Sequence, residues 1–237
     1  LKTWYAGTIS LKRSMLAGLR PGLGAILSMY EGPEDLSGWV IGDGGKKGAW
    51  ILKSGQLISN GRWPIARNIN NMPDSAEISF DRAWEGGYPA LTLSFLTDNL
   101  RSMGGNCYSL QMSGTYIYLY RYTSNSGSRN LGQNVNVDAF QNNRTRKVRI
   151  AIYASREKKQ IHLLVDGHLI KHWTDPDGFP GGGKGILFYP QDNMRMRLSN
   201  IRVVEWDGKV PQSGDTGGAV SKEDMVRLSN NDKMSGR

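Results

Sequence analysis

The sequence predicts an all-β protein, built as an antiparallel sandwich or barrel of short strands. Three observations support this prediction. Apolar and polar residues alternate with a period of two, which is the pattern of strands that bury one face. Clusters of Gly, Asn, Ser and Asp separate the alternating stretches, as turns do in all-β folds. Glycine accounts for 30 of 237 residues, and many turns need its positive φ.

The alternation defines the expected strands one by one along the chain. In one of them, for example, Leu91, Leu93 and Phe95 alternate with Thr92 and Ser94. No stretch shows the 3.6-residue apolar period of a long amphipathic helix. The expected strands cover residues 76–84, 91–95, 108–112, 116–122, 148–152, 161–165, 168–174, 185–189 and 196–206.

The pair Asp166-Gly167 predicts a two-residue hairpin turn between two of these strands. Regular pairing outward from that turn places Val165 opposite His168 and His162 opposite Lys171. His162 and His172 are then diagonal neighbours at best. A metal site shared by these histidines is therefore not expected.

Composition and charge exclude several classes of protein. No apolar run reaches the roughly 18 residues that a membrane-spanning helix needs, and aromatic and β-branched residues are too frequent for global disorder. The single cysteine, Cys107, allows neither an internal disulfide nor a site of several cysteines. The chain begins with Leu1 and shows no signal-peptide pattern, so we expect a mature product, a fragment or the ordered part of a longer protein.

The net charge of +9 is concentrated in one segment. Residues 141–172 contain eight Lys or Arg and two acidic residues, a net charge of +6. Such a segment is typical of a patch for an anionic partner, such as a nucleic acid or an acidic polysaccharide. Ordinary lysines and arginines on loops and edge strands give the same count. Because a count does not define a surface, nucleic acid is not the expected partner.

Several motifs together resemble the concanavalin A-like (laminin G-like) superfamily, nearest its bacterial 3-keto-disaccharide hydrolase-type domains. The motifs are EGPEDLSGW at 31–39, GAWILKSGQL at 48–57, IHLLVDGHLI at 161–170 and LSNIRVV at 198–204. The resemblance implies two antiparallel sheets of six or seven strands in jelly-roll order, one of them concave. The tail at 225–236 resembles small β-barrel repeats of planctomycete-type secreted proteins. Both resemblances imply a bacterial protein that is secreted, periplasmic or part of the cell envelope.

These features divide the chain into four expected parts. Residues 1–30 form an N-terminal β segment, and residues 31–207 form the sandwich. Residues 208–222 are rich in Gly, Ser, Asp and Pro, as a linker is. Residues 223–237 read as a strand, a turn and a truncated strand that needs a partner strand elsewhere. The tail's resemblance implies that the two ends form one small β appendage, a barrel into which the sandwich is inserted.

The acidic residues of one strand bear on whether the protein is an enzyme. Glucanases of the resembled superfamily carry acids at i, i+2 and i+4, which places the carboxylates on one face. Here Glu77, Asp81 and Glu85 lie four residues apart, about 13 Å along a strand. A retaining glycosidase needs its carboxyl groups about 5 to 5.5 Å apart. We therefore expect no catalytic residues, although acids from different strands leave a glycoside-active enzyme as an alternative.

A stripe of tyrosines is the most unusual local feature. Ile117 and Leu119 compete for the core side of the strand, which leaves the tyrosines as candidates for the concave face. A row of aromatic rings can stack on sugar rings or contact a protein. Arg121 and Arg149 could add hydrogen bonds to an acidic glycan if they face the same way, which the sequence leaves open. The candidate ligand-binding residues are Tyr116, Tyr118, Tyr120, Tyr122, Arg121 and Arg149.

No cofactor is expected, although calcium is a candidate. Many laminin G-like sandwiches bind Ca²⁺ at a rim, and Asp175 and Asp177 offer two carboxylates in one loop. The same Asp-Pro-Asp-Gly sequence is also typical of a plain turn.

The leading functional hypothesis is a non-catalytic extracellular or envelope module. Such a module would bind a glycan, a cell-envelope polymer or a protein partner, or serve as a structural building block. One alternative is the glycoside-active enzyme. Another is a self-assembling subunit, a homo-oligomer joined by β-strand addition of its termini.

Overall fold

The computed structural model describes residues 28–85, 87, 90–142, 146–179 and 181–210, together with strands at 2–3, 7–8, 16–20, 224–228 and 233–236. The chain divides into two compact units. One unit consists of residues 1–28 and 214–237, and the other of residues 29–213. The expected limits of the sandwich, the linker and the tail stay predictions.

The smaller unit contains two short sheets. In one of them β20 (Asp224–Leu228) lies between β3 (Leu16–Arg20) and β21 (Lys233–Gly236), and both pairings are antiparallel. The other is a hairpin of β1 (Lys2–Thr3) and β2 (Gly7–Thr8). A strand near the C-terminus therefore pairs within the same chain with a strand near the N-terminus, and both of its edges are occupied.

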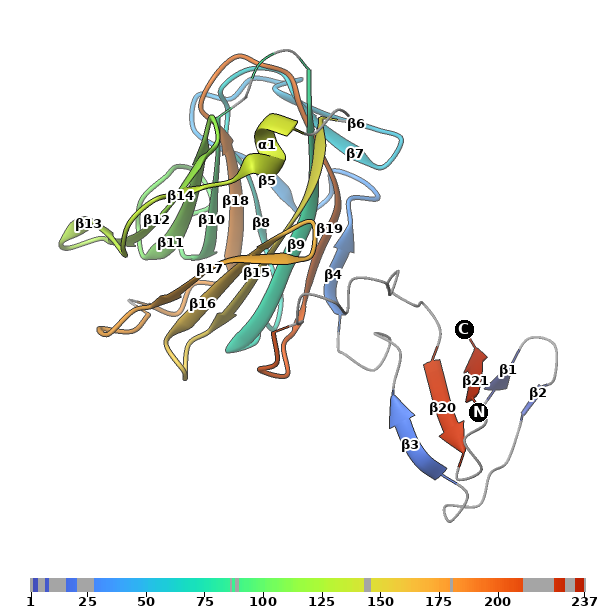
Figure 1. Cartoon of the computed structure of the whole chain (residues 1–237). Helices are drawn as coiled ribbons and strands as arrows, with labels where there is room; N and C mark the ends of the chain where they lie inside the picture. Colours follow the sequence, from blue (N-terminus) through green and yellow to red (C-terminus); the bar gives the residue numbers. More distant parts are fainter. Residues whose placement is uncertain are drawn as a thin grey trace. The chain divides into compact units, whose positions relative to one another are not determined.

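The larger unit is a sandwich of two antiparallel sheets (Figure 1). The first sheet has the order β13-β12-β11-β10-β18-β8-β5, with β14 beside β12. Its strands are β5 (Trp39–Ile41), β8 (Ile65–Asn68), β10 (Leu91–Thr97), β11 (Cys107–Ser113), β12 (Tyr116–Thr123), β13 (Gly127–Asn130), β14 (Val135–Asn136) and β18 (Gly185–Pro190).

The second sheet has the order β17-β16-β15-β9-β19-β7-β6, with β4 beside β19. Its strands are β4 (Ser28–Gly32), β6 (Trp50–Lys53), β7 (Gln56–Ser59), β9 (Ser75–Trp84), β15 (Lys147–Ser155), β16 (Gln160–Val165), β17 (His168–Thr174) and β19 (Met196–Glu205). One short helix, α1 (Asp138–Asn142), follows β14. These sheets confirm the prediction of an all-β, antiparallel sandwich.

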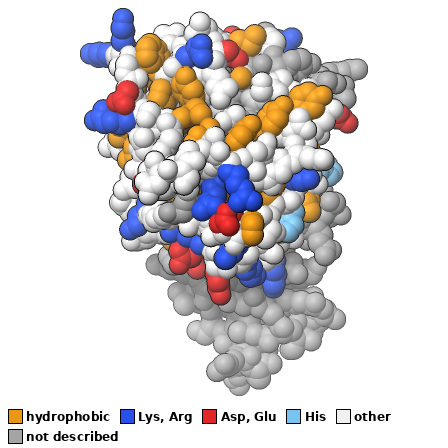
Figure 2. Space-filling view, turned by 90° about the vertical axis from the view of Figure 1, so that its left-hand side faces the viewer, with side chains coloured by type: hydrophobic (Ala, Val, Ile, Leu, Met, Phe, Trp, Pro, Cys, Tyr) orange, Lys and Arg blue, Asp and Glu red, His pale blue; other side chains and the backbone are white. Residues whose placement is uncertain are grey.

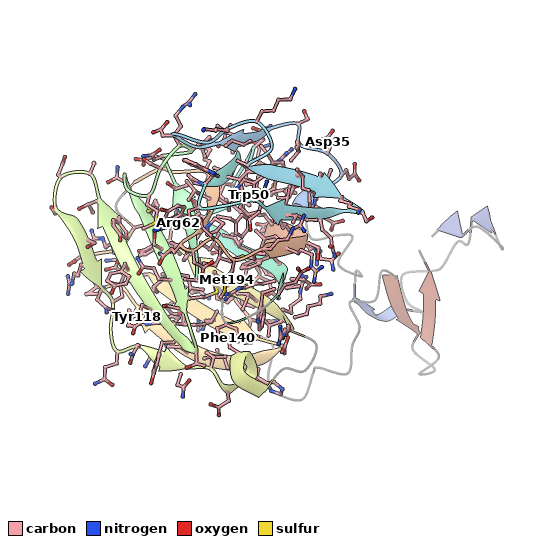
Figure 3. All side chains as sticks on the ribbon, turned by 90° about the horizontal axis from the view of Figure 1, so that it is seen from above. Asp35, Trp50, Arg62, Tyr118, Phe140 and Met194 are labelled. Atoms are coloured by element: carbon pink, nitrogen blue, oxygen red, sulfur yellow. The ribbon has the colours of Figure 1, made fainter. Side chains whose placement is uncertain are left out.

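Apolar side chains at alternate positions of the strands form the core between the two sheets. Each expected strand is present. Most of them bury their apolar face, whereas β10 and β18 are buried on both faces and Leu169 of β17 is exposed. The two sheets meet at Phe80 of β9 and Phe188 of β18, whose ring centroids lie 5.1 Å apart, edge to face. Phe140 brings α1 against the ring of Trp84 at 6.4 Å. Figure 3 shows Phe140 and Trp50 among these side chains.

The predicted register of the β16–β17 hairpin is wrong beyond the turn itself. Asp166 and Gly167 have φ of 48° and 80°, as a type I′ turn requires, and Val165 pairs with His168 as expected. The register then shifts between Leu163 and Leu164, so His162 pairs directly with His172. A bulge of this kind inserts one extra residue into one strand.

The two imidazole rings are stacked, with centroids 4.4 Å apart and planes at 15°. Burial and the neighbouring His172 both lower the pKa of His162. Within the described part of the chain, no three His, Cys, Asp or Glu side chains are grouped as metal ligands. In the same part of the chain, no helix has the length and apolar character to cross a membrane.

Candidate ligand-binding face

The tyrosine row lies on the face of the first sheet that points away from the core. On β12, Ile117 is 0% exposed and Leu119 is 1% exposed, and both belong to the core between the sheets. Because side chains alternate along a strand, the four tyrosines point to the opposite face. Tyr116 is 45% exposed there, and the other three are half-buried. Figure 3 labels Tyr118 among the side chains of this sheet.

The rings of this row are close enough to contact one another. The centroids of Tyr118 and Tyr120 lie 6.4 Å apart with planes at 26°, which is a stacked arrangement. Tyr120 and Tyr122 are 6.3 Å apart with planes at 53°. Three rings thus form a continuous aromatic strip along β12.

Small polar side chains lie beside the strip. The β11 residues opposite the four tyrosines are, in order, Ser113, Gln111, Ser109 and Cys107. Ser109 is buried and shares a 2.7 Å hydrogen bond with Ser94 of β10. Gln111 Nε2 donates to Tyr122 Oη at 3.3 Å, and Asn134 Nδ2 donates to Tyr118 Oη at 3.3 Å. The face therefore combines aromatic rings with neutral hydrogen-bonding groups. We call the outward-pointing residues of β10, β11, β12 and β13 the tyrosine face.

The rest of this sheet surface is partly covered by the loop between β10 and β11. Gly185 points outward on β18, since it pairs with Thr97 and Asn68. A Cβ at Gly185 would lie 2.5 Å from Leu100 Cδ2, so Leu100 packs directly over this strand. Glycine allows that close approach. The loop is tied to the end of β5, because Asp43 N donates to Arg101 O at 2.9 Å.

Arg121 does not join the tyrosines. It shares the parity of Ile117 and Leu119 on β12, and its guanidinium lies against a pair of acids. Arg121 Nε is 3.5 Å from Asp175 Oδ2, and Arg121 Nη1 is 2.8 Å from Asp177 Oδ2. This arginine holds the turn after β17 against the edge of the first sheet.

The two acids predicted to bind calcium do not fit a calcium site. Asp175 is 0% exposed and accepts a 2.8 Å hydrogen bond from Tyr108 Oη. Asp177 pairs with Arg121 and also with Arg129, at 2.6 Å. Two guanidinium groups neutralise these carboxylates and would repel a cation. Figure 2 shows Lys and Arg side chains next to acidic side chains on the side of the molecule that it presents.

Arg149 also lies away from the tyrosines, on the outer face of the second sheet. It contacts Asp81 at 3.0 Å, Ser79 Oγ at 2.8 Å and the Asn200 carbonyl at 3.2 Å. Lys147 Nζ is 2.8 Å from the same carboxylate of Asp81. Burial alone would raise the pKa of Asp81, but hydrogen bonds from Lys147, Arg149 and Asn200 outweigh burial and lower this pKa.

The acids at four-residue spacing each have a separate neighbour. Asp81 lies in the network just described, and Glu85 pairs with Arg197 at 2.9 Å. Glu77 hydrogen-bonds to Tyr153, where burial first and Glu77 second raise the pKa of the phenol. These contacts assign the three carboxylates to ion pairs and hydrogen bonds. The glycoside-active alternative stays a prediction.

The described strands of the basic segment 141–172 belong to the second sheet, away from the tyrosine face. Lys147 and Arg149 contact Asp81, and Arg156 pairs with Asp74 at 3.6 Å. Arg156 also lies over the ring of Phe179, 4.7 Å from its centroid. Another arginine of this segment, Arg144, lies outside the described residues. The acidic neighbours reduce the local positive charge.

Replacing Asp81 with asparagine is expected to lower the free energy of unfolding at pH 7 by about 1–3 kcal/mol, because charged hydrogen bonds are lost. The folded-state pKa of Asp81 is lowered, so its contribution is present above the unfolded pKa of about 4 and is lost as the pH falls through the folded value. The difference from the wild type should therefore shrink between pH 7 and pH 3. Urea unfolding at several pH values measures this difference in the free energy of unfolding.

The matched control is Glu85→Gln, which removes an exposed acid just after the same strand. Its pair with Arg197 is exposed, so the expected cost is below about 1 kcal/mol. A difference between Asp81→Asn and the wild type that grows on acidification would contradict the role given to Asp81.

The fold and this face define a β-sandwich whose first sheet carries an aromatic outer face, whereas the outer face of the second sheet is charged. No known family profile matches the sequence, and the search of curated proteins also finds no match. Among solved structures, carbohydrate binding module CBM66 from Bacillus subtilis is similar, with a TM-score of 0.51 and 16% identity over 71% of this chain and 96% of that one.

Two further similar structures are binding domains of botulinum neurotoxin DC. One is in complex with SialylT, with a TM-score of 0.52 and 14% identity over 76% of this chain and 48% of that one. The other is in complex with rat synaptotagmin II, with a TM-score of 0.50 and 15% identity over 71% of this chain and 44% of that one. At these identities the likeness shows a shared β-sandwich fold. The narrower resemblance to concanavalin A-like domains stays a prediction.

Proposed function

We propose that this protein is a non-catalytic binding module whose tyrosine face holds a glycan. The observation that carries the proposal is the strip of Tyr118, Tyr120 and Tyr122, with ring centroids 6.4 and 6.3 Å apart on the outward face of a sheet. Sugar rings have apolar faces that pack on aromatic rings and hydroxyl groups that need hydrogen-bond partners. The strip supplies the apolar contact, and the accessible side chains of Ser113, Gln111 and Asn134 beside it supply the hydrogen-bond partners.

Two further points support the proposal. One similar structure is a carbohydrate binding module, and another is a binding domain in complex with SialylT. The acids on β9 and just after it contact basic side chains or a tyrosine, which supports a role without catalysis. On the motifs that resemble concanavalin A-like domains, we place the protein in a bacterial cell envelope, in the periplasm or outside the cell.

Replacing Tyr118 or Tyr120 with alanine is expected to weaken glycan binding at least about tenfold each, which corresponds to about 1.4 kcal/mol. Each substitution removes one aromatic platform from the strip. Tyr120→Phe keeps the ring and should retain most of the affinity. The ligand is first identified on a glycan array, and the affinities are then measured by calorimetry.

The off-face control is Leu169→Ala, since Leu169 is 46% exposed on the second sheet and should not affect binding. Thermal melting confirms that each variant is folded. Equal affinities of the wild type and both alanine variants would contradict the proposal. A blank array together with no binding to cell-envelope polysaccharides would contradict it as well.

A further inference from the structure

The outward-facing positions of the first sheet carry no charged residue within the described strands. The β12 tyrosines define this face, and the registers of the neighbouring strands identify the other positions. Beside the tyrosines, these positions are Ser113, Gln111, Ser109, Cys107, Thr92, Ser94, Tyr189, Leu187, Ala66, Asn68, Val40, Asn130, Ser128 and Asn136. Each of them is neutral. Six of them are at most 1% exposed and are closed to a ligand, namely Thr92, Ser94, Ser109, Cys107, Leu187 and Ala66.

The contrast with the second sheet shows that this neutrality is local. On the outer face of the second sheet, Asp81, Lys147 and Arg149 form one charged network, and Arg197 pairs with Glu85. The chain as a whole has a net charge of +9. A neutral face on a strongly basic protein limits the ligands that can be recognised there.

The two arginines on β12 and β13 point away from the tyrosine face. Arg121 lies on the other side of β12 and pairs with Asp175 and Asp177. Arg129 pairs across strands with Arg121, so it shares that side, and it contacts Asp177. Asp98, in the loop after β10, accepts hydrogen bonds from Asn106, and its negative charge acts on Cys107 at the end of the face. These arginines are therefore committed to acids of the protein itself.

We propose that the ligand of this face is an uncharged, extended glycan chain that lies along β12. This inference rests on the proposed function and names the chemical class of its ligand. The exposed polar side chains of this face can pair with sugar hydroxyls by donating and accepting hydrogen bonds, and these are Ser113, Ser128, Asn130 and Asn136. A uronate or sulfate placed on the same surface loses its water without gaining a cationic partner, which is unfavourable.

The length of the row indicates a ligand of several sugar units. Tyr116 and Tyr122 are six residues apart on one strand, which corresponds to about 20 Å. The three contacting rings cover most of that length. A disaccharide would reach only part of the row, so affinity should rise with chain length and then level off.

The experiment compares oligosaccharides that share a backbone and differ in charge. We would measure β-1,4-mannohexaose against hexamannuronate, and cellohexaose against the corresponding hexaglucuronate, by calorimetry at low and high salt. The expected result is at least about tenfold tighter binding of a neutral chain than of its acidic counterpart. Because no ion pair forms, the Kd of the neutral chain should change less than about twofold with salt. Di-, tetra- and hexasaccharides of the preferred backbone test the dependence on length.

The outcomes separate this inference from the proposed function. Tighter binding of the acidic chain, weakened by salt and abolished by Tyr120→Ala, would overturn the inference while the tyrosine face remains a glycan site. Affinity that is the same for the disaccharide and the hexasaccharide would overturn the extended mode of binding. Absence of binding for both neutral and acidic chains would contradict the proposed function together with the inference.

Discussion

Replacing Asp175 with alanine is expected to lower the free energy of unfolding by about 3 kcal/mol. The carboxylate is fully buried and accepts a hydrogen bond from Tyr108 Oη at 2.8 Å and another from the backbone N of Asp177 at 3.2 Å. Its loss leaves Arg121, whose side chain is largely buried, with one acidic partner instead of two. A buried charge or hydroxyl that loses its partner keeps its desolvation cost, which is the source of the destabilisation. Urea unfolding measures the change.

Asp177→Ala is the matched control, because it removes the same side chain two residues further along the same turn. Asp177 is about half exposed, and an exposed ion pair contributes about 0–1 kcal/mol. A cost for Asp177→Ala as large as that for Asp175→Ala would contradict the distinction between the buried and exposed acid.

The Asp175→Ala variant can also be followed by spectroscopy, through the ionisation of Tyr108. Burial, and then the hydrogen bond and negative charge of Asp175, raise the pKa of Tyr108 above the ordinary value for a phenol. With Asp175 removed, only burial continues to raise it strongly, so the phenol should ionise at lower pH. Ultraviolet absorbance followed through an alkaline titration tests this expectation in the folded protein.

Much of the candidate site follows from alternation along a single strand. Ile117 and Leu119 both need the core, so the even-numbered tyrosines had to point outward, and they do. The same parity places Arg121 with Ile117 and Leu119, a signal that the sequence contains and that the interpretation of Arg121 as a ligand contact overlooked. Its acidic partners come from a turn more than fifty residues away, and no local pattern indicates that contact.

Other features depend on pairings that a single sequence does not specify. Arg149 points away from the core on its own strand, as alternation predicts, but that strand belongs to the second sheet. The direct pairing of His162 with His172 depends on a register shift within the hairpin. This shift changes which residues pair beyond it but leaves the turn itself unchanged. Strands as short as β5 and β14 hold too few residues to show a period.

The tyrosine face and the Asp175 network lie on opposite sides of β12. The ion pairs of Arg121 fix the strand from the core side, while the rings on its outer side remain available to a ligand. A face that is rigid before binding loses less conformational entropy when the ligand arrives. The neutrality of the outer side is maintained because the arginine of β12 is held on the inner side.

Replacing Phe188 with alanine is expected to lower the free energy of unfolding by about 3–5 kcal/mol. Phe188 is fully buried on β18 and joins the two sheets, with its ring centroid 5.1 Å from that of Phe80 and 6.2 Å from that of Trp39. The substitution removes apolar contacts from both sheets and leaves a cavity, which neighbouring side chains fill only in part. The melting temperature should fall by roughly 10 °C, since 1 kcal/mol corresponds to about 2–4 °C at this size.

Phe188→Leu is the control, because it keeps most of the volume and should cost less than about 1.5 kcal/mol. Equal losses for the alanine and leucine variants, measured by calorimetry and urea unfolding, would contradict the cavity explanation. Leu187 and Tyr189 flank Phe188 on β18 and point to the outer face instead. Glycan affinity of the folded Phe188→Ala protein, measured well below its melting temperature, should therefore equal that of the wild type, because the core position supports the tyrosine face without contributing to it.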